Sequence, residues 1–94
     1  MAIGKVLAVV SHPVKDYAAW KTVYDSVGPM QQKAGVTGAE VFQDPQDKNH
    51  VVVIHRFETV AAAQAFLSDP QLKDAMMRGG VTAAPSVTIA VAAG

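Results

Sequence analysis

The stretch that decides the fold is residues 50–58, HVVVIHRFE, where a run of valine and isoleucine carries four titratable or charged side chains. Such runs are typical of buried strands, in which charged groups are costly unless they are paired. Because side chains alternate across a strand, His55 lies on one face, whereas His50 and Arg56 lie on the other. The two histidines therefore cannot hold a metal ion together within a regular strand.

The segments before this strand predict a strand and a helix. Residues 3–12 are rich in β-branched side chains and end at Pro13, which cannot donate to a ladder. Asp16 is a candidate N-cap for the helix. Its aromatic and apolar side chains follow at intervals of three and four, at Tyr17, Trp20, Val23, Tyr24 and Val27. Gly28-Pro29 interrupts this helix, and residues 30–34 resume it.

The rest of the chain completes the order β-α-β-β-α-β. The expected elements are a strand at 37–43, a polar turn at 44–49, a helix from Thr59 through Leu67, a short helix from Asp69-Pro70 to Gly79-Gly80, and a strand at 85–92. This order predicts an α+β domain with the ferredoxin-like split-βαβ arrangement over residues 1–94. Its antiparallel sheet has the spatial order 4-1-3-2, with the helices on one face and the other face bare.

The composition predicts a homodimer. Half of the 94 residues are hydrophobic, and a chain this short has too little interior to bury them all in a monomer. The bare sheet face is largely apolar, which is typical of an interface. We therefore expect two sheets to pack face to face.

Charge and cysteine content exclude several classes of function. Eight basic and eight acidic residues give no net charge, which argues against nucleic acid and anionic membranes as partners. Without cysteine, thiol catalysis and thiolate metal sites are excluded. No run approaches the ~20 apolar residues of a membrane span, and residues 1–10 make a poor signal peptide. We expect a cytoplasmic protein.

Nearly the whole chain resembles the dimeric α+β barrel superfamily. The likeness lies in YAAWKTVYDS (17–26), GVTGAEVFQDPQDKNHVVVIHRFETVAAAQAFLSDPQLKDAM (35–76) and GGVTAAPSV (79–87). The superfamily includes antibiotic-biosynthesis-monooxygenase-like proteins and small polyketide cyclases, and the chain is most similar to its short bacterial members. The resemblance implies a homodimer with one pocket per subunit between sheet and helices. It leaves the activity open, because this fold hosts several reactions.

Departures from the family's chemistry narrow the choice. The cyclases use a tyrosine and a histidine on the second helical segment as their acid/base pair, and Phe66 and Leu72 stand there in this chain. Neither side chain can move a proton. The haem-degrading branch places a haem-ligating histidine in that segment, and residues 59–78 contain none. His50 does match a histidine that opens the third strand of such cyclases. We expect no metal and no organic cofactor.

Most candidate site residues follow from strand parity, strand pairing and the aromatic spacing, whereas Arg56 is implied by the resemblance, because the family's cofactor-free monooxygenases bind their substrates with Asn, Trp, Tyr and Arg. His55 should face the helices, with Tyr17 or Tyr24 orienting a phenol and Trp20 stacking on its ring. His12 should lie near His50 at a polar end of the sheet. The catalytic candidates are His55, Tyr17 and Tyr24, and the ligand-binding candidates are Trp20, His12, His50, Phe66 and Arg56.

Each of these candidates also has a structural interpretation. His55 is then a core histidine satisfied by a tyrosine hydroxyl or a carbonyl, and His12 and His50 are rim residues in water. The aromatic side chains are plain core packing. Arg56 and Glu58 form an ion pair with each other or across the dimer.

Two functions therefore remain open. One is a cofactor-free monooxygenase or cyclase acting on an aromatic or polyketide-like compound, with His55 as the base. The other is a non-catalytic ligand-binding or structural dimer. A cavity beside His55 favours the first, and a filled interior favours the second.

Overall fold

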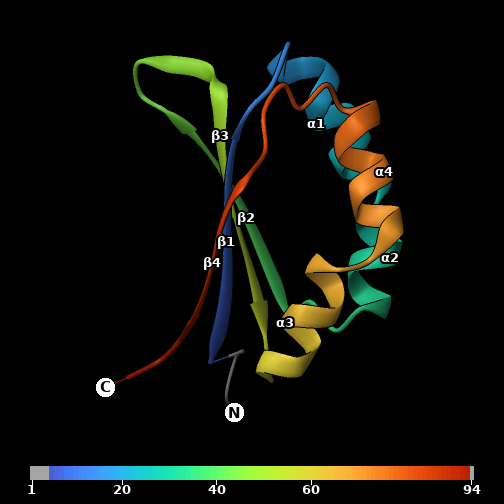
Figure 1. The fold of residues 1–94 in the computed structure, drawn as a ribbon, viewed down its shortest axis with the longest axis vertical. Coiled ribbons are helices and arrows are strands. Elements are labelled where there is room, and N and C mark those ends of the chain that lie inside the picture. Colours follow the sequence, from blue (N-terminus) through green and yellow to red (C-terminus); the bar gives the residue numbers. More distant parts are fainter. Residues whose placement is uncertain (1–4, 94) are drawn as a thin grey trace.

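Four helices cover one face of a four-stranded antiparallel sheet in the computed structural model, which describes residues 5–93 (Figure 1). The elements are β1 (Val6–Pro13), α1 (Tyr17–Ser26), α2 (Gly28–Lys33), β2 (Gly38–Asp44), β3 (Asp47–Phe57), α3 (Val60–Leu67), α4 (Pro70–Arg78) and β4 (Ser86–Val91). The strands lie in the order β2-β3-β1-β4. This is the predicted order 4-1-3-2 in reverse, so the ferredoxin-like α+β prediction is confirmed.

Helices α1, α3 and α4 begin at the residues that the sequence predicts, whereas α2 begins at Gly28 instead of residue 30, because a proline is tolerated in the first turn of a helix. The side chains of Asp16, Thr59 and Asp69 each accept a hydrogen bond from a backbone N–H two or three residues further on. These bonds satisfy amides that have no partner within the helix. Gly80, with a φ of +80°, follows the end of α4, as expected for the left-handed residue after a helix.

Among the differences from the predicted strand boundaries, two concern the end of β1 and the start of β3, whereas the bounds of β2 and β4 are shifted by one residue. Pro13 belongs to β1, opposite His50, and its carbonyl accepts a hydrogen bond from the Thr82 amide. A proline at a strand end loses only a donor, so its acceptor still serves the sheet. β3 starts at Asp47 instead of residue 50, because it pairs with β2 as far as Asp44. The predicted residues 3 and 4 of the first strand lie outside the described residues.

The core lies between the sheet and the helices and consists of two clusters. The first contains Val6, Ala8, Phe57, Ala63 and Phe66, and the second contains Val14, Trp20, Val51 and Val53. The strand members come from alternate positions of β1 and β3, so one face of the sheet is buried. Helices α1 and α3 pack on this face, whereas α4 packs mainly against α1.

The other face of the sheet carries no helix (Figure 1). Leu7, Val9, Val52 and Ile54 are half-buried there, and Phe42 is 47% exposed. We call these five residues the open face. Such contiguous apolar surface is unusual on a monomer, as the sequence analysis anticipates for a protein that associates with a second copy.

Residues 5–93 contain no helix that is long and apolar enough to cross a membrane. In the same part of the chain, no group of three or more His, Cys, Asp or Glu side chains is arranged to hold a metal ion. The cytoplasmic location and the lack of a cofactor stay predictions.

Candidate functional site

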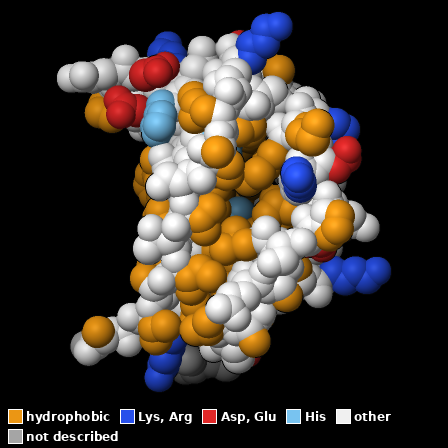
Figure 2. Space-filling view, in the orientation of Figure 1, with side chains coloured by type: hydrophobic (Ala, Val, Ile, Leu, Met, Phe, Trp, Pro, Cys, Tyr) orange, Lys and Arg blue, Asp and Glu red, His pale blue; other side chains and the backbone are white. Residues whose placement is uncertain are grey.

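A cavity lies between the centre of the sheet and the helices, where Figure 2 shows a hollow lined with hydrophobic side chains. The residues that line it are Val10, His12, Trp20, Val23, Tyr24, Val27, Val53, His55, Phe66, Leu72, Ala75 and Met76. The lining contains no Lys, Arg, Asp or Glu, so only its two histidines could carry a charge near neutral pH. The cavity therefore suits an apolar ligand with a small number of hydrogen-bonding groups.

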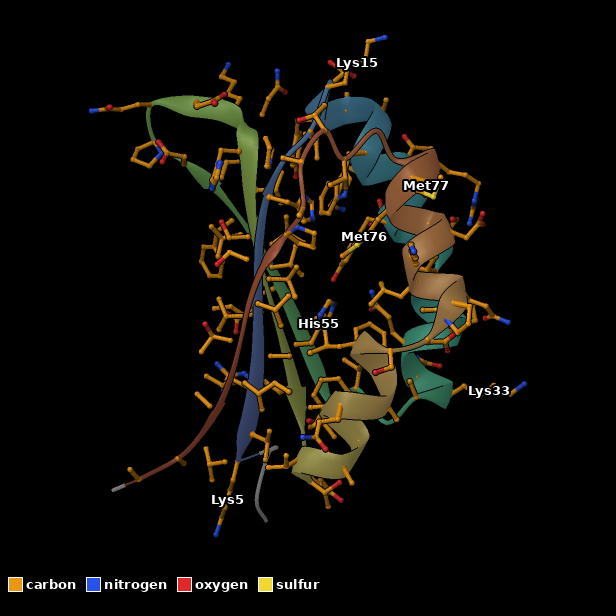
Figure 3. The ribbon with its side chains drawn as sticks, in the orientation of Figure 1. Lys5, Lys15, Lys33, His55, Met76 and Met77 are labelled. Atoms are coloured by element: carbon orange, nitrogen blue, oxygen red, sulfur yellow. The ribbon has the colours of Figure 1, made fainter. Side chains whose placement is uncertain are left out.

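The cavity is narrow. Its empty space is about 430 Å³ when the part open to solvent is included, but only about 30 Å³ is open to the centre of a water molecule. The smaller value decides what fits without rearrangement, and it corresponds to one or two water molecules. An aromatic ligand would have to displace side chains. Leu72 and Met76 are half-buried on α4, and Met76 points from α4 towards the sheet (Figure 3).

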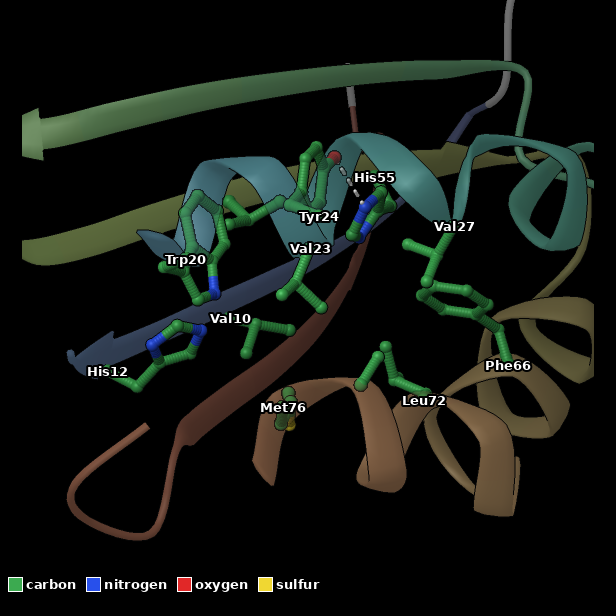
Figure 4. Close-up of a pocket in the computed structure, with 12 residues that line it drawn as sticks. Val10, His12, Trp20, Val23, Tyr24, Val27, His55, Phe66, Leu72 and Met76 are labelled. Carbon is green, nitrogen blue, oxygen red and sulfur yellow. Dashed lines mark hydrogen bonds between the residues drawn. The ribbon is translucent and has the colours of Figure 1, made fainter. Parts of the chain in front are cut away.

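His55 is a buried histidine of the cavity wall, and its side chain has a hydrogen-bond partner. It is 3% exposed, and its Nε2 lies 3.0 Å from the Tyr24 hydroxyl (Figure 4). The same nitrogen lies 3.4 Å from the Gln31 side-chain nitrogen. Its Nδ1 is buried and has no partner within residues 5–93. The parity prediction that His55 faces the helices is confirmed.

Burial shifts the pKa values of this pair. Desolvation lowers the pKa of His55 to about 4, because the charged imidazolium loses its water. Desolvation likewise raises the pKa of Tyr24, against a smaller opposing effect of its hydrogen bond to Gln31. At neutral pH His55 is therefore a neutral imidazole and Tyr24 a neutral phenol.

Two arrangements of hydrogen are compatible with the contact between Tyr24 and His55. If Tyr24 donates to Nε2, the imidazole proton sits on Nδ1; if Nε2–H donates to Tyr24, Nδ1 has a free lone pair. Heavy-atom distances and the amide orientation of Gln31 do not choose between them. In the first case Nδ1 can donate to a ligand, and in the second it can take a proton.

Aromatic rings follow one another along the cavity. Successive ring centroids are 5.8 Å apart from His12 to Trp20, 4.9 Å from Trp20 to Tyr24, 6.0 Å from Tyr24 to His55 and 5.0 Å from His55 to Phe66. These separations are typical of interacting aromatic pairs. Trp20 and Tyr24 stack with ring planes 22° apart, whereas His12 and Phe66 meet their neighbours edge-on. Trp20 and Phe66, which are predicted to bind the ligand, both line the cavity.

The prediction that His12 lies at the rim is wrong. His12 is 2% exposed and lines the cavity beside Trp20. It pairs in register with Val51 on the buried face, because β1 continues past it. Burial lowers the pKa of His12, although nearby backbone carbonyls act in the opposite direction. Its Nδ1 makes no hydrogen bond of acceptable geometry within residues 5–93.

His50 and Arg56 lie outside the cavity. His50 is on the other face of the sheet, where its Nε2 is 2.8 Å from the Ser11 hydroxyl. Arg56 pairs with Glu40 on β2 at 3.1 Å, and both side chains are solvent-accessible. The predicted pairing of Arg56 with Glu58 inside one subunit is therefore wrong, because Glu40 stands nearly opposite on the neighbouring strand. Neither residue reaches a ligand in this cavity.

Tyr17 is on the same side of α1 as Trp20, with ring centroids 5.9 Å apart, but it does not line the cavity. Of the two candidate tyrosines, only Tyr24 reaches His55. Met77 is 73% exposed and does not line the cavity. It neighbours Met76 in sequence, and adjacent helical residues face different directions.

Gln31 is a site residue that the sequence analysis missed. It is 7% exposed and contacts His55 from α2. Its signal was available, because Tyr24, Val27 and Gln31 continue the spacing of three and four across the helix interruption. A polar residue at an apolar position of that pattern indicates a buried hydrogen bond.

Comparison with known proteins gives both a family and a fold. The model of the family described as "Antibiotic biosynthesis monooxygenase" matches residues 13–78, more than half of the chain. No protein of curated function matches the sequence significantly.

Several solved structures share the whole fold. SnoaB, a cofactor-independent oxygenase from Streptomyces nogalater, has a TM-score of 0.78 at 15% identity, over 97% of this chain and 95% of that one. A conserved protein from Methanosarcina mazei has a TM-score of 0.77 at 10% identity, over 97% and 95%. The ActVA-Orf6 monooxygenase from Streptomyces coelicolor, solved with nanaomycin D, has a TM-score of 0.68 at 21% identity, over 97% and 89%. At such identities the likeness concerns the fold alone.

Proposed function

Because the chain belongs to the antibiotic biosynthesis monooxygenase family, we propose that it is a small-molecule-binding homodimer that oxygenates an aromatic compound without a metal or an organic cofactor. The proposal rests on the position of His55. This buried neutral imidazole is hydrogen-bonded to Tyr24 and lines an apolar, aromatic cavity. Two of the structurally similar proteins are an oxygenase and a monooxygenase by name.

His55 is the base in the proposed reaction. Its Nδ1 takes a proton from an acidic C–H bond of the ligand, and the electron pair stays on carbon. The carbanion combines with O₂, and the resulting peroxide anion takes the proton back from His55. Loss of water from the hydroperoxide then leaves a carbonyl group. The same carbanion can instead attack a carbonyl of its own molecule, which is the cyclase form of the proposal.

Tyr24 and Trp20 support this step. Nε2–H of His55 donates to the Tyr24 oxygen, which leaves the Nδ1 lone pair free for the ligand. Trp20 stacks on Tyr24 with ring planes 22° apart, and both rings line the cavity, where a flat ligand can contact the edges of this stack. In this proposal Tyr24 orients the histidine, whereas the sequence analysis assigns a tyrosine to the ligand phenol.

The pKa of His55 restricts the substrate. An imidazole with a pKa of about 4 has its lone pair free at neutral pH but is a weak base. Proton transfer produces a cation beside the ligand anion, and their attraction in an apolar site favours the pair. The C–H bond must still be unusually acidic. Compounds whose anion is delocalised over fused aromatic rings, such as hydroxyanthrones, meet this requirement.

The open face supports the dimer. It consists of Leu7, Val9, Phe42, Val52 and Ile54, and within residues 5–93 no helix covers it. Burying such a face against a second copy removes apolar area from water, which stabilises association by roughly 25 cal/mol per Å² before the entropic cost of binding. In this arrangement each subunit keeps its cavity on the outer side of the paired sheets.

A non-catalytic dimer is the second candidate, and the narrowness of the cavity favours it. With only about 30 Å³ open to a water centre, the aromatic row can serve as core packing. In that case His55 is satisfied by Tyr24 and needs no ligand.

Oxygen consumption with a panel of hydroxyanthrones and quinones tests the proposal. His55→Gln keeps a hydrogen-bonding side chain near Tyr24 but cannot act as a base at neutral pH. We expect its turnover to fall about 100-fold or more, as for loss of a general base. His50→Gln, on the other face of the sheet, is the matched control and should keep full turnover. Equal turnover of the wild type and His55→Gln would show that His55 is not the base.

A further inference from the structure

We propose that His12 is a second polar anchor of the cavity, and that the ligand is an uncharged, elongated aromatic molecule with a hydroxyl group at its His55 end and a hydroxyl or carbonyl group at its His12 end. One end binds His55 and the other binds His12. This inference rests on the proposed function, because it specifies the ligand of the same cavity.

His12 and His55 lie at opposite ends of the part of the sheet that lines the cavity, which we call the cavity floor. His55 pairs in register with Ala8, and His12 lies four residues further along β1 on the same face. At the rise of an antiparallel strand, four residues correspond to about 13 Å. Val10 and Val53 occupy the floor between them and also line the cavity. A ligand that touches both rings is therefore rod-like, with an apolar middle.

Each histidine has one buried nitrogen without a partner. These atoms are Nδ1 of His12 and Nδ1 of His55, and no other buried side-chain nitrogen or oxygen within residues 5–93 lacks a hydrogen bond. Leaving such a group unsatisfied is unfavourable. Both residues line the same cavity, so a single ligand with two suitably spaced polar groups can satisfy both atoms.

The walls determine the charge of the ligand. The cavity has no Lys, Arg, Asp or Glu in its lining, so a carboxylate or an amine would enter without a counterion, which is strongly unfavourable. A neutral imidazole offers one donor and one acceptor. A hydroxyl group can donate to the free Nδ1 lone pair of His55, and either a hydroxyl or a carbonyl group can pair with His12; neither group carries a charge.

The middle of the ligand lies against the aromatic row. Trp20 stands between His12 and Tyr24, with ring centroids 5.8 Å and 4.9 Å away. The rod therefore passes the face or edge of the indole whichever end enters first. Met76, which points into this space from α4 (Figure 3), is a flexible side chain that can move aside.

The test uses Trp20 as its reporter, since it is the chain's single tryptophan. Three probes share one biphenyl body: the diol with a hydroxyl at each end, the mono-ol with one hydroxyl, and the mono-ol that carries a carboxylate at its other end. Quenching of Trp20 fluorescence gives the Kd of each. We expect the diol to bind the wild type about tenfold more tightly than the mono-ol, and the carboxylate to bind at least tenfold more weakly than the diol.

His12→Phe keeps a ring beside Trp20 and removes the nitrogen. In this variant the preference for the diol over the mono-ol should disappear, while the Kd of the mono-ol changes by no more than about twofold. His12→Gln keeps a polar group and should retain part of the preference, which separates loss of the anchor from loss of the fold.

The results distinguish this inference from the proposed function. If the diol and the mono-ol bind the wild type equally, or if His12→Phe weakens both alike, His12 is not an anchor, and the assignment of His55 is untouched. If none of the probes quenches Trp20, the cavity does not take aromatic ligands, and both proposals are overturned.

Discussion

A Cβ atom added to Gly79 would lie 2.9 Å from Cδ1 of Trp20 and 3.2 Å from the carbonyl oxygen of Ala75. The φ of Gly79 is −77°, a value that any residue adopts, so glycine is required here for space. The backbone at the end of α4 thus presses directly on the indole that lines the cavity. This contact ties the position of α4 to the shape of the site.

Gly79→Ala should therefore displace the Trp20 side chain, because the added Cβ would clash with its ring. We expect the free energy of unfolding to fall by about 1–3 kcal/mol, as for overpacking in a core, with a shift in tryptophan emission. Urea unfolding followed by fluorescence measures both. Gly28→Ala is the control, because a Cβ there meets nothing within 4 Å, and an unchanged stability is expected. Equal effects of the two substitutions would contradict the proposed contact.

Stability should depend on pH through His55. The unfolded chain binds a proton on this residue near its ordinary pKa of 6.5, whereas the folded chain does so only near 4. Between these values the unfolded state holds more protons, so the stabilisation is complete above pH 6.5 and is lost as the pH falls towards 4. The loss is about 3 kcal/mol at pH 4.

Urea unfolding of the wild type and of His55→Gln at several pH values isolates this contribution, since carboxylates are common to both. The pKa of His12 is lowered as well, so part of the pH dependence should remain in the variant. Parallel curves for the two proteins would show that His55 titrates normally in the folded state.

Tyr24→Phe should remove the main hydrogen bond of the His55 side chain. Without the hydroxyl, Nε2 keeps only the longer contact to Gln31 at 3.4 Å, and a buried polar atom loses its main partner. We expect about 1–3 kcal/mol less stability, together with changed ¹⁵N chemical shifts of the His55 ring. Tyr17→Phe is the matched control two turns earlier, where the ring packs on Trp20. If only the Tyr17 variant moved the His55 signals, the hydrogen bond described above would be wrong.

Substitutions of the adjacent residues Met76 and Met77 should have different effects on stability and on ligand binding. Met76 lines the cavity, and Met77 is 73% exposed. Met76→Ala should lower stability by about 1–2 kcal/mol, below the range for fully buried methionine, and should tighten the binding of bulky aromatic ligands by enlarging the cavity. Met77→Ala should change stability by no more than about 0.5 kcal/mol and leave binding unaltered. Tighter binding by the Met77 variant instead would place the cavity wall elsewhere.

The open face should determine the assembly state. In sedimentation equilibrium we expect the wild type at twice the chain mass of 9.9 kDa. Ile54→Glu places a charge in the middle of the proposed interface and should give a monomer, because a buried unpaired carboxylate is strongly unfavourable. Gln64→Glu, on the exposed side of α3, adds the same charge elsewhere and should remain dimeric. A wild-type protein at the monomer mass would overturn the dimer.

Local patterns were enough to predict the framework and the side of the sheet on which His55 lies. Strand alternation is a property of the backbone, and N-caps such as Asp16 act within a few residues, so both can be predicted from one sequence. The register between strands is different. The burial of His12 depends on how far β1 continues beside β3, and the pairing of Arg56 with Glu40 depends on which residue of β2 stands opposite.

The role of Gln31 illustrates a second reason. Its spacing indicates that Gln31 is buried and hydrogen-bonded, but the partner is His55 on β3, and no spacing within one element predicts which residue of another element is the partner. The width of the cavity is equally non-local, since it depends on how Leu72 and Met76 of α4 meet Val10 and Val53 of the sheet. These features became visible only when the elements were placed together.

The cavity is lined both by strands of the sheet and by a helix that packs mainly against another helix, and this difference affects how the ligand specificity of the protein can evolve. The cavity floor belongs to β1 and β3, which also hold the sheet together, so most substitutions there would impair folding as well as binding. Helix α4 packs mainly against α1 instead of the sheet, yet it supplies Leu72, Ala75 and Met76 to the cavity. Mutations in α4 can therefore alter ligand preference while the sheet stays intact. New specificities should arise there first.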